Sequence, residues 1–171
     1  MDLWLGRLRE EIEEVTRQFS PSDWSRAPMG RWNSAQILEH LGRTYGTTAK
    51  MLELSVGTGA APQVRAARLP ELMLKILIVN LGVFPSGAKS PAAVTPKGDA
   101  GSVALQRALQ NLERMDIAIT KAGELWGNEK PIAMHPLLGP LTARQWRKFH
   151  YLHGNHHVRQ IRTRTGRKTT G

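Results

Sequence analysis

The sequence contains no cysteine, and this absence excludes several kinds of chemistry. Disulfide bonds, thiolate zinc sites and a cysteine nucleophile all require a sulfhydryl group, so none of them can operate in this chain. A protein without disulfides fits the reducing cytoplasm, which is the location we expect.

Long apolar runs are also missing. The most apolar stretch, residues 72–84, is interrupted by Lys75 and Asn80 and is too short to span a bilayer. The amino-terminal segment soon becomes acidic and lacks the apolar run of a signal peptide. We therefore expect a soluble, cytoplasmic protein with no membrane partner.

Acidic residues are few compared with basic ones. The chain has 14 Asp and Glu against 24 Lys and Arg, which gives a formal net charge of +10. Such a charge suggests a nucleic-acid or other anionic partner. Much of the excess, however, lies in residues 144–168, partly on the outer face of a predicted helix, and no DNA-binding motif is present. Residues 164–171 are expected to form a basic, flexible tail.

Apolar residues recur at intervals of three and four, which predicts a mainly helical protein. Four long amphipathic helices with one or two short extra ones indicate an all-α bundle. We expect a single domain over residues 1–163. The predicted helices cover residues 5–19, 34–52, 70–81, 102–122 and 143–161.

Two of these helices carry specific expectations. The helix at 70–81 is apolar on nearly all sides, so it should lie centrally in the core or be half covered by another subunit. The helix at 102–122 should face the core with one stripe of large apolar side chains. The stripe consists of Leu105, Leu109, Leu112, Met115 and Ile119.

Two connecting segments separate the helices. Residues 85–101 form a long loop rich in proline and glycine, and such a loop either lines a pocket or is disordered. The connector after Pro21 carries Trp24 and Trp32, which we expect to pack over one end of the bundle.

The last predicted helix carries four of the six histidines: His150, His153, His156 and His157. Thr142 is placed to cap its start, with Gln145 three residues on. At 100° per residue, His153 and His157 lie about 40° apart on the face that also carries Trp146 and Phe149. Two imidazoles one turn apart on a buried stripe are what a transition-metal site needs.

A third imidazole lies on another helix. His40 sits beside the inward stripe of the helix at 34–52, and three neutral histidines with an open fourth position describe a catalytic divalent-metal site. Zinc is the first choice, with nickel, iron or manganese as alternatives, because imidazole discriminates poorly among them. The open position would take a water, whose pKa the ion lowers to about 7, or the thiolate or carbonyl of a substrate. The side chain of Glu39 points about 100° away from that of His40 around the helix, so Glu39 is a poor candidate for the general base that a zinc peptidase requires.

Each of the remaining polar residues near the predicted site could have either a structural or a functional role. Gln160 lies on the same stripe and could orient a ligand or a bound water. His150 and His156 lie about 60° either side of His153. We expect each to be a solvated or capping histidine, with a supporting or acid–base role as the alternative. His135 precedes Pro136 in a connector and should hold a turn, although it could also face the pocket.

Three segments resemble the DinB/YfiT-like metalloenzyme superfamily. The closing H-x-x-H-H-x-x-Q pattern of that family matches His153, His156, His157 and Gln160, and its earlier histidine matches His40. The HP-x-x-G-x-L-T run resembles a subgroup of uncharacterised proteins of this length. The segments are WNSAQILEHLGRT (32–44), HPLLGPLTARQW (135–146) and FHYLHGNHHVRQI (149–161).

The resemblance implies a DinB-like four-helix bundle with up-down-down-up topology, a metal held by His40, His153 and His157, and a homodimer. Members of the superfamily include transferases that use a metal to activate a low-molecular-weight thiol, and hydrolases and isomerases. Our leading hypothesis is therefore a metal-dependent S-transferase or hydrolase that acts on a small molecule. The alternatives are a non-catalytic ligand-binding or dimerising bundle and, third, a basic nucleic-acid binder.

Overall fold

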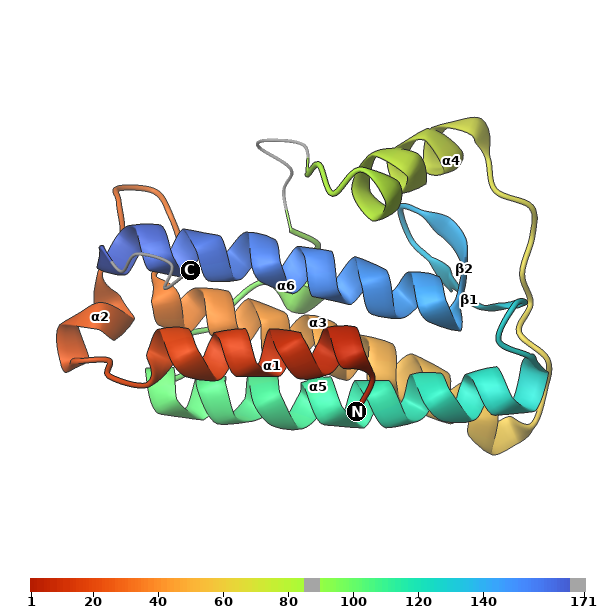
Figure 1. Ribbon diagram of the computed structural model, residues 1–171, viewed down its shortest axis with the longest axis horizontal. Coiled ribbons are helices and arrows are strands. Elements are labelled where there is room, and N and C mark those ends of the chain that lie inside the picture. The colour runs from red at the N-terminus through yellow and green to blue at the C-terminus, as the bar shows by residue number, and fades with distance from the viewer. Residues whose placement is uncertain (85–89, 167–171) are drawn as a thin grey trace.

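Four long helices lie side by side in the computed structural model of this chain, which describes residues 1–84 and 90–166 (Figure 1). These are α1 (Leu3–Thr16), α3 (Ser34–Thr58), α5 (Gly101–Trp126) and α6 (Ala143–Thr165). The shorter elements are α2 (Pro21–Ser25), α4 (Leu69–Lys75), a π-helical turn η1 (Ile76–Asn80), a 3₁₀ turn η2 (Ala92–Val94) and the strands β1 (Pro131–His135) and β2 (Gly139–Thr142).

The four long helices have an up-down-down-up topology, as predicted. Helices α1 and α6 run in one direction, and α3 and α5 run in the other (Figure 1). The two middle helices are parallel although they are consecutive long helices, so the chain has to return along the bundle between them. Residues 59–100 make this crossover, which contains α4, η1 and η2.

Capping boxes mark the starts of α3 and α6, as the sequence predicts. Asn33 Oδ1 accepts a hydrogen bond from the Gln36 backbone N–H at 2.8 Å, and the Gln36 side chain accepts one from the Asn33 N–H. Thr142 and Gln145 form the same reciprocal pair at α6. Two of the free N–H groups at each helix start are thereby satisfied, so these boundaries follow from local sequence.

Helices α3 and α5 approach each other closely, and this shifts the core face of α5. A Cβ atom at Gly42 would lie 3.1 Å from the backbone nitrogen of Ala108. Ala104 and Ala108 are fully buried, whereas Leu105 and Leu109 are only half-buried. Both leucines pack against the margin of the core, as predicted, but the centre of the buried face is shifted to the alanines, because small side chains are needed where two helix backbones come together.

The predicted helix at 70–81 is two elements, and it does not lie centrally in the core. Helix α4 is followed by the π-helical turn η1, of which only Ile78 and Val79 are buried. In Figure 1, α4 stands apart from the four long helices. Leu74 packs against the core, but the other apolar side chains of α4 are exposed in the part of the chain that is described, so a second subunit over them stays a prediction. The exposed side chains are Leu69, Leu72 and Met73 of α4 and Ile76 of η1.

A small antiparallel hairpin precedes α6, where the sequence indicated only a connector. Strands β1 and β2 pair around a turn that ends at Gly139, whose φ is +70°. Ile132 of β1 and Leu141 of β2 are fully buried, and Lys75 Nζ donates to the Pro140 carbonyl at 3.0 Å, which ties α4 to the hairpin. Strands of four or five residues are too short to show a clear alternation of apolar and polar side chains.

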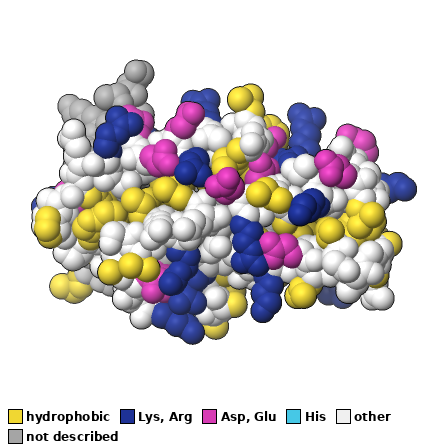
Figure 2. Space-filling view, turned by 90° about the horizontal axis from the view of Figure 1, so that it is seen from below, with side chains coloured by type: hydrophobic (Ala, Val, Ile, Leu, Met, Phe, Trp, Pro, Cys, Tyr) yellow, Lys and Arg dark blue, Asp and Glu magenta, His cyan; other side chains and the backbone are white. Residues whose placement is uncertain are grey.

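The basic carboxyl terminus is in part helical. Helix α6 continues to Thr165, so the predicted tail at 164–171 begins inside it, and residues 167–171 lie outside the described part. On the face drawn in Figure 2, Lys and Arg side chains lie among acidic and apolar ones. Among the described residues, no helix combines the length and apolarity needed to cross a bilayer.

Candidate metal centre

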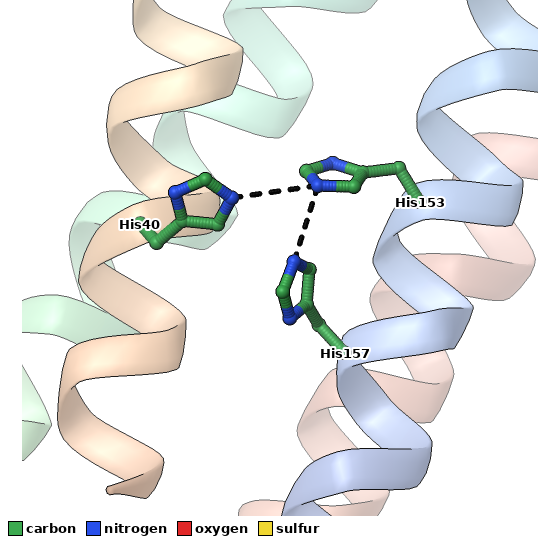
Figure 3. A group of neighbouring side chains, drawn as sticks. All are labelled: His40, His153 and His157. Carbon is green, nitrogen blue, oxygen red and sulfur yellow. Dashed lines mark hydrogen bonds between the residues drawn. The ribbon is translucent and has the colours of Figure 1, made fainter. Parts of the chain in front are cut away.

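Three histidines from two antiparallel helices meet between α3 and α6. His40 comes from the first part of α3, and His153 and His157 come from successive turns of α6 (Figure 3). His40 and His157 are buried, and His153 is half-buried. The structure thus brings together the three residues that the sequence predicts as metal ligands.

The spacing of the three ring nitrogens suits one transition-metal ion. His153 Nε2 lies 3.4 Å from His40 Nε2 and 3.1 Å from His157 Nε2. One nitrogen from each of the three rings lies within 4.8 Å of the others. Two nitrogens bound tetrahedrally to zinc at about 2.0–2.1 Å are about 3.3 Å apart.

The outer ring nitrogens of His40 and His157 have oxygen partners. His40 Nδ1 donates to the Val94 carbonyl at 2.9 Å, with Ser90 Oγ at 3.2 Å. His157 Nδ1 donates to Gln160 Oε1 at 3.0 Å. A neutral imidazole carries one proton, so these bonds leave the Nε2 lone pairs of both rings facing the cluster.

Packing rather than hydrogen bonding orients His153. Its Nδ1 is buried without a hydrogen-bond partner among the described residues. The ring stacks on Phe149 with 5.6 Å between centroids and 5° between planes, and Phe84 lies 5.9 Å away. With the proton on Nδ1, this ring presents the same lone pair at Nε2 as the other two.

The surroundings keep all three imidazoles neutral. Burial lowers the pKa of His40 below its ordinary 6.5. Burial and the neighbouring imidazoles hold the pKa of His153 well below that value. The pKa of His157 falls to about 3, mainly through burial and then through the charge of His40. A metal ligand must be unprotonated, and these three rings are so at neutral pH.

Gln160 connects the cluster to His156. While its oxygen accepts from His157, its Nε2 donates to His156 Nε2 at 2.9 Å. The ring of His156 also packs against Phe84, with 5.1 Å between centroids. His156 is half-buried beside the cluster rather than freely solvated, and its supporting or acid–base role stays a prediction.

His150 lies apart from the cluster and is fully buried, so the expectation of a solvated or capping histidine was wrong. Its ring packs against Tyr45 and stacks on Trp146, with centroids 5.6 and 5.7 Å away. The cause is Gly154, where a Cβ atom would collide with Leu8 and lie 2.9 Å from Tyr45 Oη. The missing side chain lets α1 and α3 close over this part of α6.

His135 also lies outside the cluster, where it holds a turn as predicted. Its Nδ1 accepts hydrogen bonds from the backbone N–H groups of Leu137 and Leu138 at 3.1 and 3.2 Å. The ring packs against Phe149, with 4.6 Å between centroids, and thus seats the hairpin on α6.

Glu39 has a positioning role that its local sequence does not indicate. Its side chain is fully buried and accepts hydrogen bonds from the backbone N–H groups of Lys97, Gly98 and Asp99 at 2.7, 2.9 and 3.0 Å. Arg43 Nε pairs with the same carboxylate at 2.9 Å. Burial alone would raise the pKa of Glu39, but these donors lower it to about 2.

The hydrogen bonds from residues 97–99 to Glu39 indicate the role of the loop at 85–101. Residues 85–89 lie outside the described part, but residues 90–99 run along α3 and bring Val94 and Ser90 to His40. The loop thus supplies the oxygen partners of one histidine. Glu39 with Arg43 four residues later is also the pattern of an exposed helix face, and the backbone partners of the carboxylate are 58 to 60 residues away in sequence, so local sequence does not indicate its burial.

The chain is similar to known proteins in two respects. Residues 78–164 match the family model described as "Protein of unknown function (DUF1569)". The structure aligns with that of YfiT from Bacillus subtilis with a TM-score of 0.58 and 15% sequence identity, over 96% of this chain and 85% of that chain. YfiT is described as a probable metal-dependent hydrolase with an unusual four-helix bundle topology. No curated protein sequence matches the chain. The alignment shows that this chain has a YfiT-like fold, as predicted.

Proposed function

We propose that this chain, which belongs to the DUF1569 family of proteins of unknown function and has a YfiT-like fold, is a metal-dependent enzyme. In this proposal His40, His153 and His157 hold one divalent ion. The observation that carries it is the convergence of three Nε2 atoms from α3 and α6.

The donor set fits such an ion in four ways. The contacts between ring nitrogens match those of imidazoles around one metal, and the three rings are neutral. His40 and His157 donate through Nδ1 to oxygen atoms, the arrangement that orients metal-bound histidines. Among the described residues, no fourth histidine or carboxylate joins the group, so one coordination position is left for a reactant.

Zinc is the ion that we propose first, with nickel, iron and manganese as alternatives. When bound, such an ion supplies Lewis-acid chemistry and lowers the pKa of a water or thiol in the open position. His156 is the proton carrier that we propose, because it is half-buried beside the cluster and held by Gln160. We favour hydrolysis of a small molecule, which agrees with the description of YfiT, and keep thiol-dependent S-transfer as the second reaction.

Metal analysis of the purified protein tests this proposal. We expect about one divalent ion per chain in the wild type, and loss of that ion in His40→Gln and His153→Ala. His135→Asn is the matched control, because it removes an imidazole outside the cluster but keeps an acceptor for the hairpin turn. Full metal occupancy in both cluster variants would show that the ion binds elsewhere.

A non-catalytic binding or dimerising bundle is the alternative function. The exposed apolar side chains of α4 favour it, since a face of this kind suits a partner. A wild-type protein that carries no metal at neutral pH, and folds equally well after treatment with a chelator, would support this alternative. The predicted homodimer and the nucleic-acid hypothesis stay predictions.

A further inference from the structure

Two aromatic side chains pack against the three-histidine cluster from segments that connect the helices. Trp32 stands just before α3, and its ring lies 5.0 Å from that of His40 between centroids. Phe84 follows η1, and its ring lies 5.9 Å from that of His153 and 5.1 Å from that of His156. One aromatic ring therefore contacts the candidate ligand from α3, and the other contacts a candidate ligand from α6.

Both of these rings are half-buried, unlike the aromatic rings of α6 itself. Phe149, which stacks on His153, keeps only 7% of its surface exposed, and Trp146 keeps 2%. Trp32 and Phe84 pack against the core with part of their surface and leave the rest accessible. The candidate ligands are thus in contact with buried aromatic rings, which only pack, and with accessible ones, which a small molecule can reach.

Hydrogen bonds hold the backbone next to both accessible rings. Asn33, the residue after Trp32, forms the capping box that begins α3. Gly82, two residues before Phe84, adopts a left-handed conformation with φ at +69°, and its N–H donates to the Ile78 carbonyl at 3.0 Å. Binding surfaces that are ordered in advance lose less entropy when a ligand binds, so the two rings are suited to contact one.

Two polar side chains next to the cluster already have partners within the chain. Ser90 Oγ hydrogen-bonds to His40 Nδ1 at 3.2 Å, and Gln160 uses its oxygen for His157 and its nitrogen for His156. The two aromatic rings, in contrast, offer accessible apolar surface. Small-molecule sites are typically lined by apolar and aromatic side chains, with a few polar groups that fix orientation. This arrangement suits a ligand whose reactive group is polar and whose remaining part is apolar.

We propose that Trp32 and Phe84 bind a flat apolar group of the substrate, such as an aromatic ring, while its reactive group occupies the open position at the three histidines. The substrate class is thus a small molecule with an aromatic part close to the bond that reacts. A flat ring suits these side chains because aromatic rings attract each other in offset-stacked and edge-to-face arrangements. The link to a reaction rests on the proposed function, whereas the apolar subsite itself rests on the two rings.

A pair of hydroxamates tests this subsite, because both bind a metal ion through the same group. Acetohydroxamate carries a methyl group where benzohydroxamate carries a phenyl group. Titration calorimetry of the wild type as purified, with its metal content measured, should show benzohydroxamate binding about tenfold more tightly or better. We expect this ratio to fall about threefold or more in Trp32→Leu and in Phe84→Leu. Leucine keeps much of the apolar volume but removes the flat ring, and the ratio cancels any change in metal affinity.

Phe19→Leu is the matched control. Phe19 is half-buried like Phe84, but its ring packs against Trp24, with 4.7 Å between centroids. We expect this variant to keep the wild-type ratio. An equal fall of the ratio in Phe19→Leu would overturn the subsite. Equal affinity of the metal-bearing wild type for both hydroxamates would overturn it too, but would leave the proposed function standing.

Indole, which carries no metal-binding group, separates the subsite from the proposed function. We expect indole to bind the wild type, and its binding to weaken about threefold or more in Trp32→Leu and Phe84→Leu but not in Phe19→Leu. A wild type that holds no metal but binds indole in this way would refute the proposed function and support the subsite. A wild type that holds metal, and whose indole affinity depends on neither Trp32 nor Phe84, would refute the subsite alone.

Discussion

Replacing Glu39 by glutamine tests the link between the crossover loop and the histidine cluster. The wild-type carboxylate accepts three backbone hydrogen bonds from residues 97–99 and pairs with Arg43. The pKa of Glu39 falls from 4.5 to about 2, and this gap corresponds to about 3 kcal/mol in favour of the folded, ionised state, at ~1.4 kcal/mol per pH unit. The side chain of Glu39 is fully buried, unlike the carboxylates of the exposed ion pairs.

We expect Glu39→Gln to lower the free energy of unfolding at pH 7 by about 3 kcal/mol. Urea denaturation followed by circular dichroism measures this change. Because the folded pKa is depressed, the stabilisation is complete above pH 4.5 and is lost as the pH falls toward 2. The difference between variant and wild type should therefore be constant from pH 8 to pH 6 and shrink below pH 4.5.

Glu53→Gln is the matched control. Glu53 pairs with Arg114, but both side chains are substantially exposed, at 39% and 48%. Exposed pairs contribute about 0–1 kcal/mol, so this variant should change stability much less. If Glu39→Gln costs no more than Glu53→Gln, the buried carboxylate does not anchor the loop.

Glu39→Gln should also weaken metal binding, although Glu39 does not point into the cluster. Release of the loop removes the Val94 carbonyl from His40 Nδ1. Loss of such an outer partner weakens metal affinity by about 10–100-fold, which competition with a chelator measures.

Two further predictions concern the buried polar groups. Burial lowers the pKa of His135 to about 4 and, together with the charge of His135, that of His150 to about 3. The stabilisation from these two neutral rings is complete above pH 6.5 and is lost toward pH 3, so the free energy of unfolding should fall below pH 6.5 by up to about 3 kcal/mol per pH unit. A urea midpoint that is unchanged between pH 7 and pH 5 would contradict this. Tyr45 Oη is buried without a partner among the described residues, so Tyr45→Phe should raise the free energy of unfolding by about 1 kcal/mol; a loss of stability would instead show that a buried water satisfies the hydroxyl.

The histidines show what kinds of site residue a sequence can predict. His153 and His157 belong to one helix with a strong start signal, so their common face follows from helical geometry alone. His40 could be joined to them because it lies beside an apolar stripe and because the segments resemble a known family. His150 was misread, since its burial depends on Gly154, which lets two other helices close over it. Periodicity along one helix carries no information about such a contact.

The sequence by itself determined the presence of the four long helices, the residues at which α3 and α6 begin, and the side of α6 that faces inward. It also excluded cysteine chemistry. These properties are local, because they depend on spacings of three and four residues and on capping side chains. Only the tertiary structure decided that Glu39 holds the crossover loop and that Val94 supports His40. Each of these contacts joins residues more than fifty positions apart. They form when the helices pack, and no pattern in the intervening sequence specifies them.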